Sequence, residues 1–407
     1  MRLLIYSIQY APEFTSNAIL ITGLAQQLAA RGHQVTVLAG TPHYQLPSVP
    51  PGYWWRPFRQ EFRQGVKVMR CWAFPKSEGK TAKFLNYASF TLTSLIAGLF
   101  IKSPEAIIIV SPPFWLGFNA LLLRAFRRCP VIYNAQDLFP DAYLASQEVR
   151  AGWLVRAMSG LMTCIYRGSD RITVITGSFA EAIGALGIDR GKVVTIPNFI
   201  DTTEVTPLPR ANSFRRRHAL NEKYVVMYMG NVGYTHGTEL LVEAAEKLAQ
   251  IPDLVFLVIG GGSKQPDLER LARERRLGNL QFLPTQPREF IPEILATADV
   301  LVLTSKPGVG KTSFPSRIYN FLLAARPVVA SVDENSDLAH VLRGGGAGIV
   351  TAPGNVEDFC QALTTLYHDA GLRERLGRNG AEFMAVHYSP QAVVEQYESL
   401  LKGLSAR

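Results

Sequence analysis

The chain has 407 residues, of which 47% are hydrophobic and 18% are charged. This length is too great for one core and predicts two domains, and the composition excludes a disordered chain. The net charge of +9 lies entirely in the first half, because residues 1–200 carry 20 Lys and Arg against 10 Asp and Glu, whereas residues 201–407 carry 22 against 23.

The positive first half indicates an anionic partner, such as a phospholipid leaflet or a diphosphate-bearing acceptor. Nucleic acid is the competing partner, but the sequence has no helix-turn-helix, zinc-finger or RNA-binding signature. The four cysteines are scattered without Cys-x-x-Cys spacing, which is typical of reduced core residues in a cytoplasmic protein. No signal peptide is expected, because residues 1–6 lead directly into a strand.

The first half opens with a β-loop-α-β unit, the usual start of a doubly wound sheet. A strand is predicted at residues 2–7, a loop at 10–17, a helix at 18–31 and a second strand at 33–38. Further strands, with helical stretches between them, are predicted at 105–110, 130–134, 171–175 and 193–196.

Two segments of the first half have an unusual composition. Residues 84–101 contain no charge and reach the lower limit for a membrane span, but their Asn, Ser and Thr content favours a core or interfacial helix. Residues 53–59, YWWRPFR, mix aromatics with arginine, which suits either an anchor at the level of lipid headgroups or a solvent loop with a small apolar cluster.

The second half repeats the α/β pattern after a predicted linker at residues 198–217. The repeat predicts a cleft between two similar domains, and such clefts hold ligands. Its predicted strands are 224–230, 254–260, 280–283, 299–303 and the segment PVVAS that starts at Pro327. Its predicted helices are 239–249, 268–276, 290–296 and an amphipathic C-terminal helix, 393–404, which crosses back to the first domain.

The segment 304–330, TSKPGVGKTSFPSRIYNFLLAARPVVA, predicts a strand end, a loop, a helix and the next strand. Its loop is rich in Gly, Ser and Thr, and Ser316 or Ser313 can cap the helix. Backbone N–H groups at a helix start favour an anion, and Lys311 and Arg317 add positive charge. We therefore predict a diphosphate site here, at the carboxyl edge of a parallel sheet. The alternatives are an ordinary βα loop or a P-loop, but a P-loop needs Gly where Ser305 stands.

Several motifs in the same order resemble the family-4 glycosyltransferases of the GT-B class, over nearly the whole chain. The resemblance is strongest to the branch that builds exopolysaccharide and O-antigen repeat units, colanic-acid fucosyltransferases included. The matching segments are YAPEFTSNA, LAARGHQVTVLAGTPHY, QDLFPD, VVTIPNFID, GNVGYTHGTELLVEAA, FPSRIYNFLLAARPVV and GAGIVTAPGNVEDF.

The resemblance implies a GT-B fold, an α/β architecture of two Rossmann-like doubly wound domains facing a central cleft. It assigns residues 1–200 to acceptor binding, 218–385 to the nucleotide-sugar donor and 386–407 to the returning helix. It also implies transfer of a sugar from a nucleotide diphosphate, with retention, to a glycan or lipid-linked acceptor. The expected location is the inner face of the plasma membrane, on an anionic surface. Uridine is the first expectation for the base and guanosine the second.

No cofactor or metal is expected, because the sequence has no DxD motif and no His, Cys or Asp cluster with metal-ligand spacing. Asp137 is the candidate nearest the reacting centre, as base or sugar ligand, or else a turn aspartate. Glu13 is the second catalytic candidate, or else a solvated loop charge. Donor-binding roles are expected for Asn17, Gly230, Asn231, Gly233, His236, Gly260, Gly261, Lys311, Ser313, Ser316, Arg317 and Asn320. Acceptor-binding roles are expected for Tyr10, His43, Tyr44 and Asp141.

The sequence departs from the family pattern at four positions. Thr312 and Asn320 stand where the family usually has two glutamates, and Asn231 and His236 stand where it has Arg and Lys. Arg317, Lys311 or Lys306 can supply the missing charge. The replacements at Thr312 and Asn320 keep one alternative open, a non-catalytic sugar-nucleotide-binding or scaffold subunit of a polysaccharide assembly complex. A nucleotide-sugar epimerase with the same two-domain fold is a further alternative.

Overall fold

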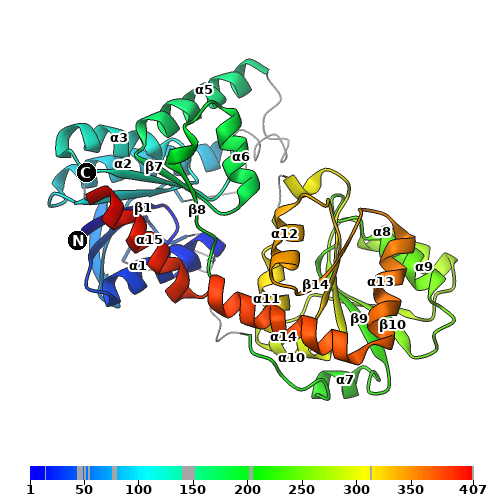
Figure 1. The fold of residues 1–407 in the computed structure, drawn as a ribbon. Coiled ribbons are helices and arrows are strands. Elements are labelled where there is room, and N and C mark those ends of the chain that lie inside the picture. Colours follow the sequence, from blue (N-terminus) through cyan, green and yellow to red (C-terminus); the bar gives the residue numbers. More distant parts are fainter. Residues whose placement is uncertain are drawn as a thin grey trace. The chain divides into compact units, whose positions relative to one another are not determined.

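The computed structural model divides the chain into two compact units. Unit 1 comprises Met1–Phe199 and Pro390–Arg407, and unit 2 comprises Ile200–Ser389 (Figure 1). The structure describes residues 1–13, 15–43, 49, 52–53, 56–75, 80–139, 152–200, 205–311 and 314–405. Trp54, Trp55, Tyr44, Asp141, Thr312 and Ser313 therefore lie outside the described residues.

Unit 1 is built on an eight-stranded sheet with the order β3-β4-β2-β1-β5-β6-β7-β8. All neighbours are parallel except β3 and β4, which form an antiparallel pair at one edge. The strands are β1 (Arg2–Ser7), β2 (Gln34–Gly40), β3 (Phe58–Arg63), β4 (Val66–Cys71), β5 (Ala106–Val110), β6 (Val131–Ala135), β7 (Arg171–Val174) and β8 (Val193–Thr195).

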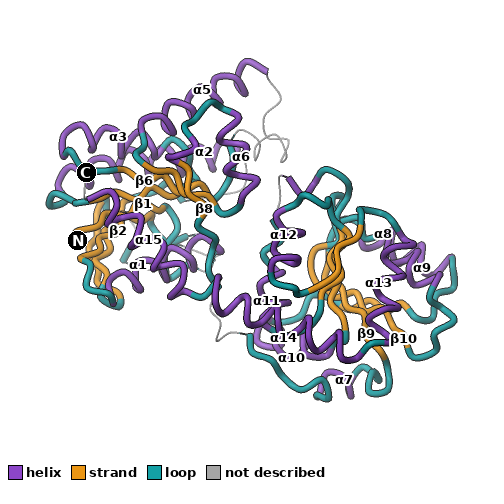
Figure 2. The backbone as a smooth tube through the Cα atoms, in the orientation of Figure 1, coloured by secondary structure: helices purple, strands orange, loops and turns teal. Residues whose placement is uncertain are grey.

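Helices cover both faces of this sheet (Figure 2). One face packs against α1 (Ser16–Ala30) and α15 (Pro390–Ser405). The other packs against α2 (Lys80–Phe100), α3 (Leu116–Arg127), α5 (Gly152–Gly168) and α6 (Gly177–Ala185). Parallel strands require crossovers of this kind, so the central strands are buried on both sides and are almost entirely apolar.

The strand pair β3–β4 was not predicted from the sequence. Its turn is Gln64-Gly65, and both residues have positive φ, 45° and 80°. A two-residue turn of this kind matches the twist of an antiparallel hairpin. The alternation of residues 58–63 and 66–71 around Gln-Gly is the signal that could have identified the hairpin.

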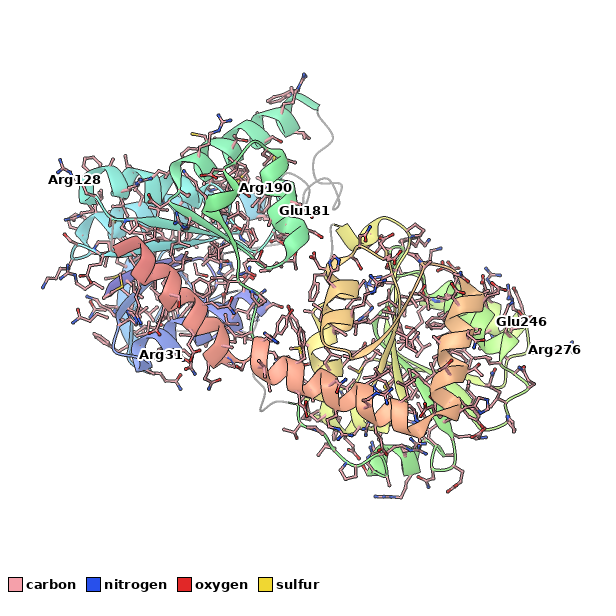
Figure 3. The ribbon with its side chains drawn as sticks, viewed as in Figure 1. Arg31, Arg128, Glu181, Arg190, Glu246 and Arg276 are labelled. Atoms are coloured by element: carbon pink, nitrogen blue, oxygen red, sulfur yellow. The ribbon has the colours of Figure 1, made fainter. Side chains whose placement is uncertain are left out.

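The C-terminal helix α15 completes unit 1. Val393, Tyr397 and Leu401 lie in the same apolar core as α1. Arg31, at the end of α1 (Figure 3), contacts Glu398 at 3.0 Å and Glu395 at 3.3 Å, and His33 Nε2 lies 3.0 Å from Glu398. The buried face of α15 therefore belongs to the core of the first domain.

Unit 2 is a six-stranded parallel sheet with the order β11-β10-β9-β12-β13-β14. The strands are β9 (Tyr224–Asn231), β10 (Leu254–Gly261), β11 (Leu280–Leu283), β12 (Val300–Thr304), β13 (Val328–Ser331) and β14 (Gly348–Thr351). The helices are α7 (Ser213–Arg217), α8 (Glu239–Lys247), α9 (Gln265–Glu274), α10 (Ile291–Thr297), α11 (Arg317–Leu323), α12 (Asp337–Gly344), α13 (Val356–His368) and α14 (Ala370–His387). The predicted pair of Rossmann-like, doubly wound α/β sheets is confirmed.

Helix α7 corrects the predicted linker, because part of residues 198–217 folds onto unit 2. Arg215 of α7 is only 1% exposed and donates to the carbonyl oxygens of Leu220, Lys223 and Thr297. Its guanidinium lies 3.4 Å from Asp299, and that carboxylate also accepts from the backbone N–H of Val225 at 2.8 Å. Every charge in this group has a partner, so α7 is fixed to the sheet.

No helix among the described residues is long and apolar enough to cross a membrane. Residues 84–101 instead lie mostly in α2, whose inner side packs on the sheet through Phe90 and Ala97.

We predict that Arg215→Ala lowers the free energy of unfolding by about 3–5 kcal/mol. Asp299 keeps only the half-exposed Arg210 as a cation partner, and the buried carbonyl oxygens of Leu220, Lys223 and Thr297 lose their donor. Urea unfolding followed by circular dichroism measures this loss. Arg216→Ala, at the exposed neighbouring position, is the matched control and should change stability by less than about 0.5 kcal/mol. Equal losses in the two variants would show that the buried network contributes nothing.

Candidate functional site

Each sheet reverses its strand order at one point, between β1 and β5 in unit 1 and between β9 and β12 in unit 2. Ligands of doubly wound sheets bind outside the carboxyl ends of the strands at such a point, because the crossovers leave in opposite directions there. In unit 2 the two flanking loops are residues 232–238, after β9, and residues 305–316, after β12.

These two loops enclose a pocket in unit 2. Thr235 and His236 come from the first loop, and Ser305, Val309 and Gly310 come from the second. The first residue of α11, Arg317, lies at the same pocket. The sequence analysis identified His236 and Arg317 but missed Thr235 and Ser305, whose residue types give no signal by themselves.

The Arg317 guanidinium is held in a fixed orientation by residues of β9. Its Nη1 donates to the Met229 carbonyl oxygen at 3.3 Å, and its Nη2 donates to the Tyr228 hydroxyl at 3.2 Å. The guanidinium also stacks over the Tyr228 ring, 4.7 Å from the centroid. Its Nε is buried without a hydrogen-bond partner among the described residues. Arg317 is therefore oriented by unit 2 while one donor stays available.

Gly230 makes this position of Arg317 possible. Its φ of 143° is unfavourable for other residues, and a Cβ atom there would lie 1.9 Å from Arg317 Nη1. Gly260 has a related structural role, because its Cβ would lie 2.0 Å from the Gly230 carbonyl oxygen. These two glycines are thus required by packing whether or not a ligand is bound.

Three further buried polar atoms near Arg317 lack a partner within the described residues: His236 Nδ1, Ser305 Oγ and Asn320 Oδ1. Asn320 is one turn beyond Arg317 on α11. Buried polar groups in folded proteins are nearly always hydrogen-bonded, so such a cluster at a switch point indicates a polar ligand. The cluster offers donors suited to phosphate oxygens and an amide oxygen suited to a hydroxyl.

Burial lowers the pKa of His236, and the nearby Arg317 charge lowers it further. The imidazole is therefore neutral at pH 7, unlike the Lys of the family pattern. Its backbone is fixed on both sides, because its N–H donates to Gly233 at 3.2 Å and its carbonyl oxygen accepts from Thr304 Oγ1 at 2.6 Å.

The glycine-rich loop after β12 differs from its prediction. The N–H groups of Gly308 and Gly310 both donate to the Asp333 carboxylate, each at 3.0 Å. These two amides are occupied by a carboxylate of the protein, which contradicts a P-loop, and neither amide belongs to the expected cradle of free N–H groups. Ser316 stands before α11 but makes no capping hydrogen bond through its side chain, and the other expected cap, Ser313, lies outside the described residues. Lys311 Nζ lies outside the described atoms.

The remaining donor candidates occupy varied positions. Asn231 is exposed at the end of β9, and its carbonyl oxygen accepts from the Tyr228 hydroxyl at 2.6 Å. Gly261 follows Gly260 in the partly buried end of β10. Asn17 is partly buried in the first turn of α1, a helix of unit 1 that Thr15 caps through its side chain.

In unit 1, Glu13 is only 5% exposed, which excludes a solvated loop charge. Its Oε1 accepts from the backbone N–H of His43 at 3.0 Å. The His43 ring lies 2.6 Å from the Thr41 carbonyl oxygen through Nδ1 and 3.0 Å from Asn86 Nδ2 through Nε2. The neutral tautomer with a proton on Nδ1 satisfies both contacts. Glu13 and His43 are therefore parts of one network at the carboxyl ends of β1 and β2.

Arg70 of β4 is a structural residue that the sequence analysis missed. It donates to the carbonyl oxygens of Ala11 and Gly40 and to Glu61, at 2.7 Å for the last, and so joins the loop after β1 to the carboxyl end of β2. The Tyr10 ring centroid lies 5.8 Å from Arg70 Cζ. Tyr10 is fully buried, and burial raises the pKa of its hydroxyl to about 12. Its side chain lies inside the core under the loop after β1.

Asp137 follows β6 and has a perturbed carboxyl group. Burial raises its pKa, and Lys83 of α2 opposes that shift in part. A carboxyl group of raised pKa beside the switch point is a candidate for proton transfer. Among the described residues, no group of three or more His, Cys, Asp or Glu could hold a metal ion.

Comparison with known proteins assigns each unit to a family. Residues 19–198 match the model for "Glycosyl transferase 4-like domain", and residues 210–383 match "Glycosyl transferases group 1". The putative colanic acid biosynthesis glycosyl transferase WcaI of Escherichia coli is 26% identical over 92% of this chain and 95% of its own length. A D-inositol 3-phosphate glycosyltransferase of Actinosynnema mirum is 24% identical over 89% and 86%.

Solved structures of other proteins share the fold. Sucrose-phosphate synthase from Thermosynechococcus elongatus superposes with a TM-score of 0.72 and 19% identity, covering 100% of this chain and 99% of that one. Anabaena HepE in complex with UDP has a TM-score of 0.71 and 13% identity, covering 99% and 100%.

We predict that Gly230→Ala destabilises unit 2 more than Gly308→Ala does. Both sites have positive φ, which costs an alanine about 1–2 kcal/mol, but a Cβ at Gly308 meets nothing within 4 Å. At Gly230 the new Cβ displaces the Arg317 guanidinium from its contacts, which adds roughly 1–3 kcal/mol. Urea unfolding of the two variants measures the difference, and equal losses would contradict the fixed position of Arg317.

Proposed function

The chain is a GT-B glycosyltransferase, with a glycosyl transferase 4-like domain followed by a glycosyl transferases group 1 domain, and from this we propose a specific reaction. The enzyme moves a sugar from a nucleotide-diphosphate donor to a lipid-linked glycan acceptor, with retention of configuration and without a metal. The relative WcaI, named for colanic acid biosynthesis, supports a role in bacterial surface polysaccharide synthesis.

The observation that carries this proposal is the cluster of buried polar atoms around Arg317 that lack a partner in the described part of the chain. During transfer, the bond from the anomeric carbon to the diphosphate breaks, a bond to the acceptor oxygen forms, and the acceptor hydroxyl loses its proton. Negative charge develops on the leaving diphosphate. A guanidinium held in place by Tyr228 and Met229 stabilises that charge without reorganising.

Asn320 and Ser305 supply the neutral contacts in this proposal. The Asn320 amide oxygen accepts a hydrogen bond from a ribose hydroxyl, and the Ser305 hydroxyl donates to a phosphate oxygen. Neutral His236 contributes a hydrogen bond through its imidazole in place of a full charge. Because UDP is bound in the HepE structure, uridine is our first choice of base, and guanosine remains second.

Unit 1 supplies the acceptor side of the reaction. The raised pKa of Asp137 suits a group that binds a sugar hydroxyl or accepts its proton. Glu13 positions the His43 loop through its backbone contact. The positive charge of residues 1–200 suits an acceptor that carries phosphate in an anionic membrane, so we place the enzyme at the inner face of the plasma membrane.

The alternatives predict different products. A purified protein that binds a nucleotide-sugar but neither transfers nor hydrolyses it is a binding or scaffold subunit. Release of an altered sugar without acceptor indicates an epimerase. Formation of a glycosylated acceptor with the donor's anomeric configuration, observed by NMR in the presence of EDTA, supports the proposed reaction in full.

We predict that Arg317→Ala weakens UDP binding about 10–100-fold, because a charge-assisted hydrogen bond contributes about 1.5–3 kcal/mol. Uridine binding should change less than about 3-fold, since uridine has no phosphate. Isothermal titration calorimetry with both ligands measures the difference. Arg343→Ala, on the surface of α12, removes one guanidinium elsewhere in unit 2 and serves as control. Equal weakening of UDP and uridine would overturn this role of Arg317.

We predict that Asn320→Ala reduces the preference for UDP over 2′-deoxy-UDP. The loss should approach the value of one neutral hydrogen bond, about 0.5–1.5 kcal/mol, or up to roughly 10-fold in the ratio of the two dissociation constants. Asn379→Ala on α14 is the matched control, because that amide bonds only the Gly346 carbonyl oxygen in the contacts shown. An unchanged ratio in Asn320→Ala would make Asn320 a structural residue.

A further inference from the structure

One outer surface of unit 1 combines exposed apolar side chains with positive charge. Helices α2, α3 and α5 together contain no Asp or Glu. Apolar side chains are nevertheless exposed along them, on the side away from the sheet: Phe84, Leu85, Leu92, Ile96, Leu99, Phe100, Leu122, Phe126, Trp153 and Leu161. Exposed apolar groups in such number, on helices without negative charge, indicate a contact surface.

A groove of about 840 Å³ lies at the C-terminal end of α2. Phe58 and Phe62 of β3 form one wall, and Phe100 and Ile101 at the end of α2 form the other. Two of these rings are largely uncovered, Phe62 at 71% and Phe100 at 84% exposed. The groove is therefore an open apolar trough between the edge hairpin and α2.

The rim of the groove is cationic. Arg2, Lys67 and Lys102 line it, and none of its lining residues is Asp or Glu. Neither lysine has an ion-pair or hydrogen-bond partner within the described part of the chain. Arg2 donates to the Ser103 carbonyl oxygen at 2.9 Å, and the nearby Glu105 accepts from the Arg2 backbone N–H. His33, also at the groove, is bonded to Glu398. The two lysines are thus the available charges.

Two unusual sequence segments meet at this groove. Phe58 belongs to the aromatic and arginine-rich segment 53–59, and Phe100 and Ile101 end the uncharged segment 84–101. The two segments are separate in the sequence, and the β3–β4 hairpin brings Phe58 to the same groove as Phe100 and Ile101. An apolar trough with a cationic rim is complementary to an amphiphile that has an apolar chain and an anionic head.

We propose that this groove binds the acyl chain of an anionic phospholipid while α2 and α3 lie on the bilayer surface. Lys67 and Lys102 contact the lipid phosphate, and Phe62 and Phe100 enclose the upper part of the chain. Arg128, the residue after α3 (Figure 3), adds charge to the same helical layer. This inference rests on the proposed function in one respect: it takes the acceptor to be lipid-linked.

The groove and the candidate site of unit 1 lie at opposite edges of the sheet. Arg2, Gln34 and Lys67 are at the amino ends of their strands, whereas Glu13 and Asp137 follow carboxyl ends. Helix α2 connects the two edges. Its first exposed ring, Phe84, lies 5.9 Å from Trp115, which follows β5 beside the switch point. A bilayer that contacts α2 along its length therefore reaches the edge where a lipid-linked acceptor has to arrive.

Vesicle flotation tests the proposal with the full chain. We expect the parent to float with phosphatidylglycerol–phosphatidylcholine vesicles at low salt and to float less as salt rises. Phe62→Ser with Phe100→Ser, and separately Lys67→Glu with Lys102→Glu, should each reduce the bound fraction at least 10-fold. Phe290→Ser and the pair Arg216→Glu with Arg217→Glu alter exposed residues of unit 2 and are the matched controls, with changes below 2-fold.

A second measurement locates the lipid directly. Phosphatidylglycerol with a photoactivatable group on its acyl chain should label peptides that contain residues 58–62 and 97–102, as mapped by mass spectrometry. Labelling confined to the outer side of α2 and α3, or flotation of both groove variants at the parental level, would overturn the groove as lipid site. Parental circular dichroism and an unchanged urea midpoint of unit 1 show that the variants are folded, and failure of UDP binding in the parent would count against the proposed function alone.

Discussion

The reversal of strand order at β9 and β12 is the constraint on which the candidate site depends. Parallel strands need crossover helices, and at this one point the crossovers depart to opposite sides of the sheet. The carboxyl ends of β9 and β12 are therefore left to loops instead of helices. Arg317 enters this gap because α11 begins where the second loop ends, and Gly230 leaves room for its guanidinium.

Two arginines of unit 2, the buried Arg215 and the partly buried Arg317, differ in the hydrogen-bond partners of their guanidinium groups. Arg215 donates to carbonyl oxygens on several segments and faces Asp299, so nothing in its surroundings requires a further partner. Arg317 faces a tyrosine and a carbonyl oxygen, and one of its donors has no partner among the described residues. A cation that is oriented but has no carboxylate partner is ready for an anionic ligand, because binding then incurs little reorganisation.

Unit 1 has the same type of fold, with different side chains at its two edges. Arg70 and Glu13 connect the segments at the carboxyl edge of its sheet, which gives this edge a fixed shape. The amino edge instead exposes aromatic rings and lysines around an apolar groove. Since the central strands are buried on both faces, only the two edges and the outer sides of the helices remain for binding.

The sequence by itself determined the two α/β sheets, the positions of most strands, and the choice of Arg317, His236 and Asn320 as residues of interest. Apolar runs separated by helical periods and glycine-bearing loops are local patterns, and local patterns survive without knowledge of the partner strands. The hairpin β3–β4 was missed although its Gln-Gly turn was visible, because charged residues interrupt the strands. Helix α7 was assigned to a linker because Arg215 looks like a solvated charge in the sequence, and only the fold shows that Asp299 lies beside it.

Only the tertiary structure decided that the Gly308 and Gly310 amides bind Asp333, that Glu13 is buried against the His43 loop, and that residues 58–62 meet residues 100–102 across a groove. Each of these is a contact between segments distant in the chain, and the physical partner of a polar or charged group is set by which segments the sheet order brings together.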